Sequence, residues 1–146
     1  MKNSNDNNIL DDVSIEDLIP QKKPFVMVDK LLQYSEDKII AGLTISENNI
    51  FTKNTLFTEP GLIEHMAQTI ALHTGYQYYL RNLPAPTGYI GSIKKVEIKK
   101  LPKLGEKIKT TVSVLHEIMG VTLVNISVEL DNEEIAFGEM KTVLAK

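Results

Sequence analysis

Apolar and small residues fill most positions of one long stretch, residues 60–80, with the sequence PGLIEHMAQTIALHTGYQYYL. A proline suits the first turn of a helix, because the N–H groups of that turn have no acceptor within the helix. At helical spacing the apolar side chains would cover well over half of the circumference, which is typical of a buried helix. Glu64 is the one carboxylate in this stretch. The apolar side chains are Leu62, Ile63, Met66, Ala67, Ile70, Ala71 and Leu72.

Most of the remaining chain consists of short runs of apolar residues that alternate with polar ones, which predicts strands. The clearest run is 121–130, where Val124, Ile126 and Val128 would face inward. Further strands are predicted at residues 25–34, 39–45, 87–99, 107–117 and 135–144, and a short capped helix at 14–19. Residues 47–59 show no strong period and are interpreted as a loop.

These elements predict an α+β fold that consists of a hairpin, the long buried helix and then a four-stranded antiparallel meander. A sheet of about six strands can bury the helix only by curving around it. One helix covers one face of such a sheet incompletely, so we expect two such units to pair.

Length and composition narrow the class of protein. A chain of 146 residues is expected to form one domain, here residues 13–146, after a polar tail at residues 1–12 that is predicted to be disordered. The absence of cysteine excludes disulfides and thiolate chemistry, and no signal peptide or membrane-spanning run is found, so we expect a cytoplasmic protein. The net charge of -3 argues against a general nucleic-acid-binding protein.

Lysines gather in one segment of this acidic chain. They either line an exposed strand edge, where they would prevent pairing with other sheets, or form a docking surface for an acidic partner. The segment contains Lys94, Lys95, Lys99, Lys100, Lys103, Lys107 and Lys109.

Three motifs, in order along the chain, are similar to those of one enzyme family. They are IPQKKPFVMVDKLL, PGLIEHMAQ and GYIGSIKKVEIKKLPKLGEKIKTTVSV. Together they resemble the hotdog-fold 3-hydroxyacyl-[acyl-carrier-protein] dehydratases, and in particular the divergent dehydratase-like proteins of aryl polyene and flexirubin-type pigment pathways. The resemblance implies a hotdog fold, in which a curved antiparallel sheet wraps a central helix. It also implies a dimer or higher assembly that acts on acyl chains carried by the phosphopantetheine arm of an acyl carrier protein, and no cofactor is expected.

Dehydration of a 3-hydroxyacyl thioester requires a base for the C2 proton, an acid for the C3 hydroxyl and a group that stabilises the thioester oxygen. By resemblance, the N–H of Gly61 would serve the thioester oxygen at the positive end of the helix, and Glu64 would be the acid. Gln68, one turn later, would either orient Glu64 or make an ordinary polar contact with the sheet. The alternative for Glu64 is that it only stabilises the start of its own helix.

The base is missing from its expected place. The family carries a histidine in a Gly-His-Phe-Pro-Gly segment, 14 residues ahead of the glutamate. The corresponding sequence in this chain is NNIFTKNTLFTEPG, and we assign the position of the histidine to Phe51. His65 lies about 100° around the helix from Glu64 and His73 about 12 Å along it, so both are weaker candidates for the base. His116 belongs to no motif, and the spacing of metal ligands is absent.

Three functions are therefore open. The first is a hydro-lyase that forms trans-2-enoyl thioesters in fatty-acid or polyene biosynthesis. In the family, the acid and the base of one site come from different subunits, so a chain without the histidine would supply Glu64 to a histidine-bearing partner in a heteromeric enzyme. The second is a non-catalytic acyl-binding scaffold, and the third is a hotdog thioesterase in which the carboxylate activates water.

Overall fold

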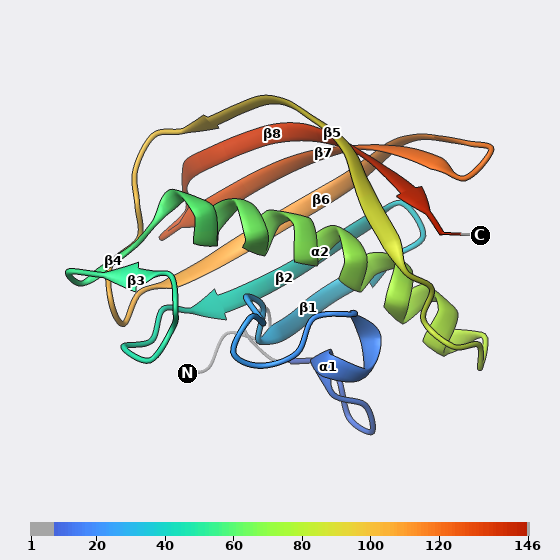
Figure 1. The fold of residues 1–146 in the computed structure, drawn as a ribbon, viewed down its shortest axis with the longest axis horizontal. Coiled ribbons are helices and arrows are strands. Elements are labelled where there is room, and N and C mark those ends of the chain that lie inside the picture. The colour runs from blue at the N-terminus through green and yellow to red at the C-terminus, as the bar shows by residue number, and fades with distance from the viewer. Residues whose placement is uncertain (1–7, 146) are drawn as a thin grey trace.

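The computed structural model describes residues 8–145. One long helix, α2 (Glu59–Leu80), lies across one face of a six-stranded antiparallel sheet (Figure 1). A short helix, α1 (Ile15–Leu18), and a two-stranded ribbon, β3 (Thr52–Lys53) and β4 (Leu56–Phe57), accompany them. This arrangement confirms the predicted α+β hotdog fold. The order across the large sheet is β1 (Lys30–Ser35), β2 (Lys38–Thr44), β6 (Lys107–Ile118), β7 (Val121–Leu130), β8 (Glu133–Leu144) and β5 (Gly88–Ile98).

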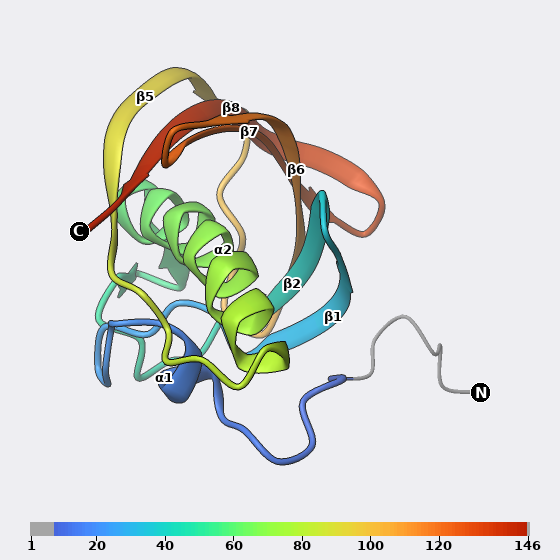
Figure 2. The ribbon, with the colours of Figure 1, turned by 90° about the vertical axis from the view of Figure 1, so that its right-hand side faces the viewer.

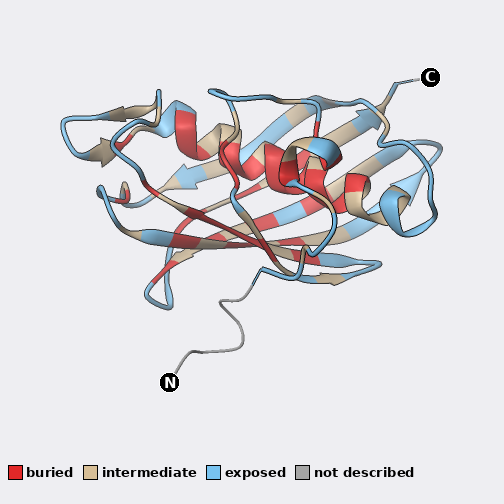
Figure 3. Ribbon diagram, turned by 90° about the horizontal axis from the view of Figure 1, so that it is seen from below, coloured by how far each residue is buried: buried red, intermediate tan, exposed pale blue. Residues whose placement is uncertain are grey.

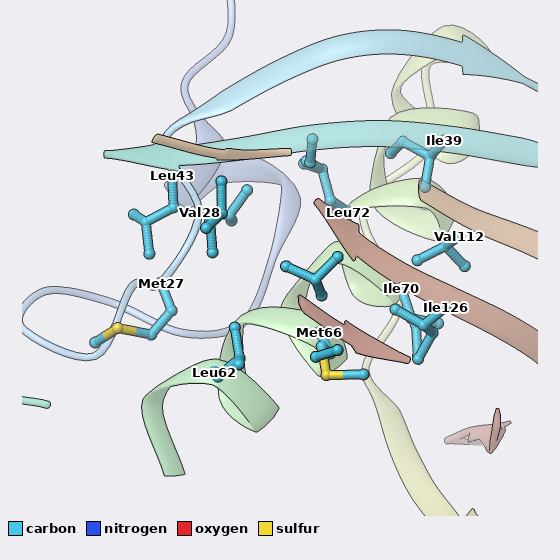
Figure 4. Packing of buried hydrophobic residues seen from close by; sticks show 14 of the residues in the cluster. Met27, Val28, Ile39, Leu43, Leu62, Met66, Ile70, Leu72, Val112 and Ile126 are labelled. Carbon is cyan, nitrogen blue, oxygen red and sulfur yellow. The ribbon is translucent and has the colours of Figure 1, made fainter. Parts of the chain in front are cut away.

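The sheet curves around α2 from β5 at one edge to β1 at the other, and α1 lies at the side that the sheet leaves open (Figure 2). Side chains of α2 such as Leu62 and Met66 belong to the same continuous core as Val112 and Ile126 of the sheet (Figure 4). All four are buried, and each such side chain contributes about 1.5–3 kcal/mol through burial.

Burial along α2 is uneven around its axis (Figure 3). The side that faces the sheet is buried, as predicted. Ile63, Ala67 and Ala71, which the sequence pattern also placed inside, are only half buried. The curved sheet covers most of the helix but leaves this stripe incompletely covered.

The predicted strand at 25–34 begins later, at Lys30. The N–H of Asp29 still donates to the Gly42 carbonyl of β2, but Phe25 and Met27 bond to side chains of α2 and not to the sheet. The predicted loop at 47–59 contains the β3–β4 ribbon, whose strands have two residues each and are too short to show a period.

The predicted four-stranded meander is wrong. Strand β5 pairs with β8 at the edge of the sheet, while β6 pairs with β2. The connection 99–106 is therefore a crossover and not a simple turn. It passes the β3–β4 ribbon, where the N–H of Phe57 donates to the Pro102 carbonyl at 2.9 Å (Figure 1). Alternation within a strand predicts its two faces but not its neighbours.

The segment that precedes α1 runs beside β1. The N–H of Ile9 donates to the Leu31 carbonyl at 2.8 Å, and the N–H of Leu31 donates to Asn8 Oδ1 at 3.1 Å. Leu10 packs against the core, so this part of the predicted disordered tail is held in place. The rest of that prediction, residues 1–7, lies outside the described residues. Among residues 8–145, neither helix has the length and hydropathy needed to span a bilayer.

Candidate active site

The first turn of α2 offers a free backbone donor. Thr58 precedes the helix, but its hydroxyl does not cap it and donates to the Phe51 carbonyl at 2.7 Å. The first bond within the helix runs from the N–H of Leu62 to the Thr58 carbonyl. Pro60 has no N–H, so Gly61 carries a first-turn N–H at the positive end of the helix dipole.

Gly61 is also required by packing. A Cβ at this position would lie 2.5 Å from the Phe51 Cβ and 2.7 Å from the Phe57 ring. Both distances are far below van der Waals contact, so only glycine lets the helix start approach these two residues. Close packing therefore explains why this residue is glycine. The binding of a thioester oxygen by the Gly61 N–H stays a prediction.

Glu64 is half buried on α2, one turn before Gln68. The Nε2 of Gln68 donates to Glu64 Oε2 at 2.7 Å, which is the i,i+4 pairing expected from the sequence. One carboxylate oxygen is thus occupied by a neutral donor. No side-chain hydrogen bond of the other oxygen, Oε1, is found among the described residues.

Gln68 also contacts the segment that precedes β1, and not the sheet itself as its alternative role predicted. Its Oε1 accepts the N–H of Met27 at 2.6 Å, and its Nε2 donates to the Phe25 carbonyl at 2.8 Å. Both partners are backbone groups with fixed roles, so the orientation of the Gln68 amide is determined. The amide is completely buried and links the Phe25–Met27 segment to Glu64.

His65 is a core residue and not a base that faces Glu64. Its side chain is fully buried, and its two ring nitrogens contact the Met27 carbonyl at 2.6 Å and Thr110 Oγ1 at 2.7 Å. Because a carbonyl only accepts, Nδ1 carries the proton, and Nε2 of the neutral ring accepts from the Thr110 hydroxyl. Removal from water lowers the pKa of His65 to about 4, although the bond to Met27 opposes this shift.

The buried His65 should make folding stability depend on pH. Its folded pKa of about 4 lies below the ordinary value of 6.5, so the unfolded chain binds the extra proton more readily between these values. The stabilisation is complete above about pH 6.5 and is lost as the pH falls toward 4, by about 3 kcal/mol in total. Urea unfolding at a series of pH values measures this loss. The variant His65→Asn should lack it, and an equal loss in both proteins would assign it to carboxylates instead.

The other two histidines also lie away from Glu64. His73 Nε2 contacts the Ser35 carbonyl at 2.9 Å and its ring packs on Tyr34, while His116 is exposed on β6.

The position of the missing histidine is Ile50. It lies 14 residues before Glu64 and one residue before Phe51, so the assignment to Phe51 was off by one. Neither the Ile50 nor the Phe51 side chain can take up a proton, so neither can replace the histidine as the base. Within residues 8–145, no group of three or more His, Cys, Asp or Glu side chains is placed to hold a metal.

The lysines lie in three places, namely strand β5, the crossover 99–106 and strand β6. Lys94 and Lys95 are exposed on the edge strand β5. Lys99 and Lys100 pair with Glu134 and Glu133, at 3.2 and 3.8 Å. Lys103 lies in the crossover and pairs with Leu56 of β4, a strand that ends just before α2 begins. The remaining two, Lys107 and Lys109, belong to β6.

Thr110, which was not predicted as a site residue, is fully buried on the concave face of β6. The signal was present, because Thr110 stands between Ile108 and Val112 at an inward position of an alternating strand. A hydroxyl at such a position needs a hydrogen-bond partner. Only the fold reveals that this partner is His65.

Known proteins resemble this chain in both sequence and fold. The model of the ApeP-like family, described as ApeP dehydratase, matches residues 13–145. The 3-hydroxyacyl-[acyl-carrier-protein] dehydratase FabZ of Aliivibrio fischeri is 25% identical, with 93% of this chain and 94% of the relative covered. FabZ of Clostridium botulinum is 28% identical, with 94% and 97% covered.

Among solved structures, the dehydratase heterocomplex ApeI:P from Xenorhabdus doucetiae contains a chain that matches with a TM-score of 0.85 at 15% identity, over 92% of each chain. This likeness supports the hotdog fold. The family match covers nearly the whole chain and includes Gly61, Glu64 and Gln68. The chain therefore belongs to the ApeP-like family of dehydratases, and its function is that of a hydro-lyase of the 3-hydroxyacyl thioester type.

Proposed function

We propose that this chain is the acid-bearing subunit of a two-chain dehydratase. The substrate is a 3-hydroxyacyl thioester on an acyl carrier protein, and the product is the trans-2-enoyl thioester and water. The observation that supports this most is the asymmetry of the site. Glu64 is held in place by Gln68, whereas His65, His73 and His116 all lie elsewhere in the described part of the chain.

The chemistry divides between the two chains. A histidine of the second chain removes the C2 proton, and the electron pair of that C–H bond forms the C2–C3 double bond. The C3–O bond breaks, and Glu64 gives its proton to the departing hydroxyl, which leaves as water. The thioester oxygen gains negative charge during this step and accepts the N–H of Gly61.

The edge strand β5 is the proposed place for the second chain. It is the last strand of the sheet on its side, and Ile90 and Ile93 are 38% and 49% exposed. Antiparallel pairing of a second hotdog chain there would continue the sheet. The solved relative described above is itself a dehydratase heterocomplex, which fits this assembly.

The half-buried stripe of α2 supports a route for the acyl chain. Beyond Glu64, small residues Ala67, Ala71 and Thr74 line a cavity that Ile90 of β5 and Thr142 of β8 also line. Residues 64 to 74 span about 15 Å along the helix axis. An acyl chain whose C3 lies at Glu64 would extend along this stripe.

The lysines near the helix start are the proposed contact for the acidic carrier protein. Lys103 is exposed, and the crossover places it beside β4 just before α2. The ion pairs of Lys99 and Lys100 are exposed, and such pairs contribute little and exchange readily. Lys94 and Lys95 instead fit protection of the β5 edge from unspecific pairing.

The test compares the chain alone with the chain plus a histidine-bearing hotdog dehydratase subunit. Each preparation is incubated with 3-hydroxyacyl carrier protein, and the enoyl product is measured by mass spectrometry. We expect enoyl product from the mixture and almost none from the chain alone, because the base is then absent.

Other results would replace this proposal. Enoyl formation by the chain alone at the rate of the mixture would mean that the base is its own. Release of a free carrier thiol would indicate a thioesterase. Retention of the acyl chain without turnover in any mixture would indicate a scaffold.

A further inference from the structure

The main chain of Met27 is held on both sides by α2. Its carbonyl accepts the His65 Nδ1–H at 2.6 Å, and its N–H donates to Gln68 Oε1 at 2.6 Å. These two side chains are three residues apart, so they project from neighbouring positions of the helix toward the same peptide segment. Met27 is itself completely buried, so water does not compete for either bond.

The sheet fixes this clamp from the opposite side. Thr110 of β6 is fully buried, and its hydroxyl donates to His65 Nε2 at 2.7 Å. That bond keeps the ring in the tautomer whose Nδ1–H points at Met27. A second local bond, from the Thr69 hydroxyl to the His65 carbonyl at 2.8 Å, secures the helix backbone at the same turn.

The other end of the network is Glu64. Once Met27 is fixed, the planar amide of Gln68 is fixed through its Oε1, and its Nε2 has two hydrogens to donate. One goes to the Phe25 carbonyl at 2.8 Å and the other to Glu64 Oε2 at 2.7 Å. Every donor and acceptor of this amide is thereby used in one arrangement.

From this geometry we propose that Thr110 and His65 are positioning residues, which set the direction of the Glu64 carboxyl group through Met27 and Gln68. Neither residue touches the substrate. The flexible Glu64 side chain is directed only by the last bond of the network, and its Oε1 is thereby kept free for proton transfer. The low pKa of His65 fits this role, because a neutral ring at neutral pH preserves the acceptor for Thr110.

Three variants of neighbouring residues test this proposal. Thr110→Val removes the hydroxyl and keeps the shape, Thr110→Ser keeps the hydroxyl, and Thr111→Val makes the same change on the opposite face of β6. The kinetic readout rests on the proposed function and uses the two-chain assembly. We expect about a tenfold lower kcat with unchanged KM for Thr110→Val, since small displacements of catalytic groups cost this much or more. Thr110→Ser and Thr111→Val should stay within about twofold of the original chain.

A second readout needs no activity. The side-chain amide resonances of Gln68, observed by NMR in the chain itself, should shift and exchange faster with water in Thr110→Val, and should remain as in the original chain in the other two variants. Unchanged Gln68 resonances in Thr110→Val would overturn the proposal, whether or not the assembly turns over. A kcat that falls equally in Thr110→Val and Thr110→Ser would also overturn it, because retention of the hydroxyl would then make no difference to the rate. If no assembly is active but the Gln68 signals respond as described, the proposed function fails and the positioning network stands.

Discussion

Replacement of Glu64 by glutamine is expected to lower enoyl formation by the two-chain assembly by about a hundredfold to ten-thousandfold, the range for loss of a general acid. The amide has the same size as the carboxyl group, so the helix and the Gln68 contact can persist. It has no acidic proton to give to the departing hydroxyl, however. The loss should therefore appear in kcat and leave KM nearly unchanged, as steady-state kinetics with a 3-hydroxyacyl carrier protein would measure.

Glu59→Gln is the matched control. Glu59 is the exposed first residue of α2, and its replacement removes the same charge from the same end of the helix. We expect a rate within about twofold of the original, because surface changes of this kind act weakly. An equal loss in both variants would assign the effect to the charge of the helix start and would remove Glu64 from the role of acid.

Gly75→Ala is expected to destabilise the fold by on the order of 4 kcal/mol, in the upper range for single substitutions. A Cβ at Gly75 would lie 1.9 Å from the carbonyl oxygen of Leu18, the last residue of α1. Backbone cannot move aside by a change of rotamer, so α1 would have to leave α2. Urea unfolding followed by circular dichroism measures the change in free energy of unfolding.

Gly88→Ala provides the comparison for this variant. There the new Cβ would meet Leu144 Cδ2 at 3.7 Å, an ordinary contact, so we expect a change below about 1 kcal/mol. If Gly75→Ala were as stable as Gly88→Ala, the close contact between α1 and α2 would not exist in solution.

The helices and most strands could be predicted from the sequence, but the pairing of the strands with one another could not. The helix at 60–80 and the strand at 121–130 were found because their side chains repeat at the period of their structure. The place of β5 beside β8 could not be found in this way, because the same alternation suits an edge strand and a central one. The late start of β1 depends on contacts with α2 that lie about 40 residues away in sequence.

At the site, local geometry was predictable and distant geometry was not. The contact between Glu64 and Gln68 follows from helical spacing alone. The position of His65 depends on Met27 and Thr110, which are 38 and 45 residues away in the chain. Helical spacing places His65 beside Glu64 on the helix but does not show that the His65 ring turns into the core.

The close packing at Gly61 affects the medium in which the chemistry takes place. Phe51 and Phe57 lie against the first turn of α2, and Phe57 is completely buried. Hydrocarbon at this point lowers the local dielectric constant, so the partial positive charge of the helix start is less screened than it would be in water. A hydrogen bond from Gly61 to a negatively charged oxygen gains strength under these conditions. In the proposed reaction, a phenyl ring next to the position of the missing histidine would therefore help by excluding solvent.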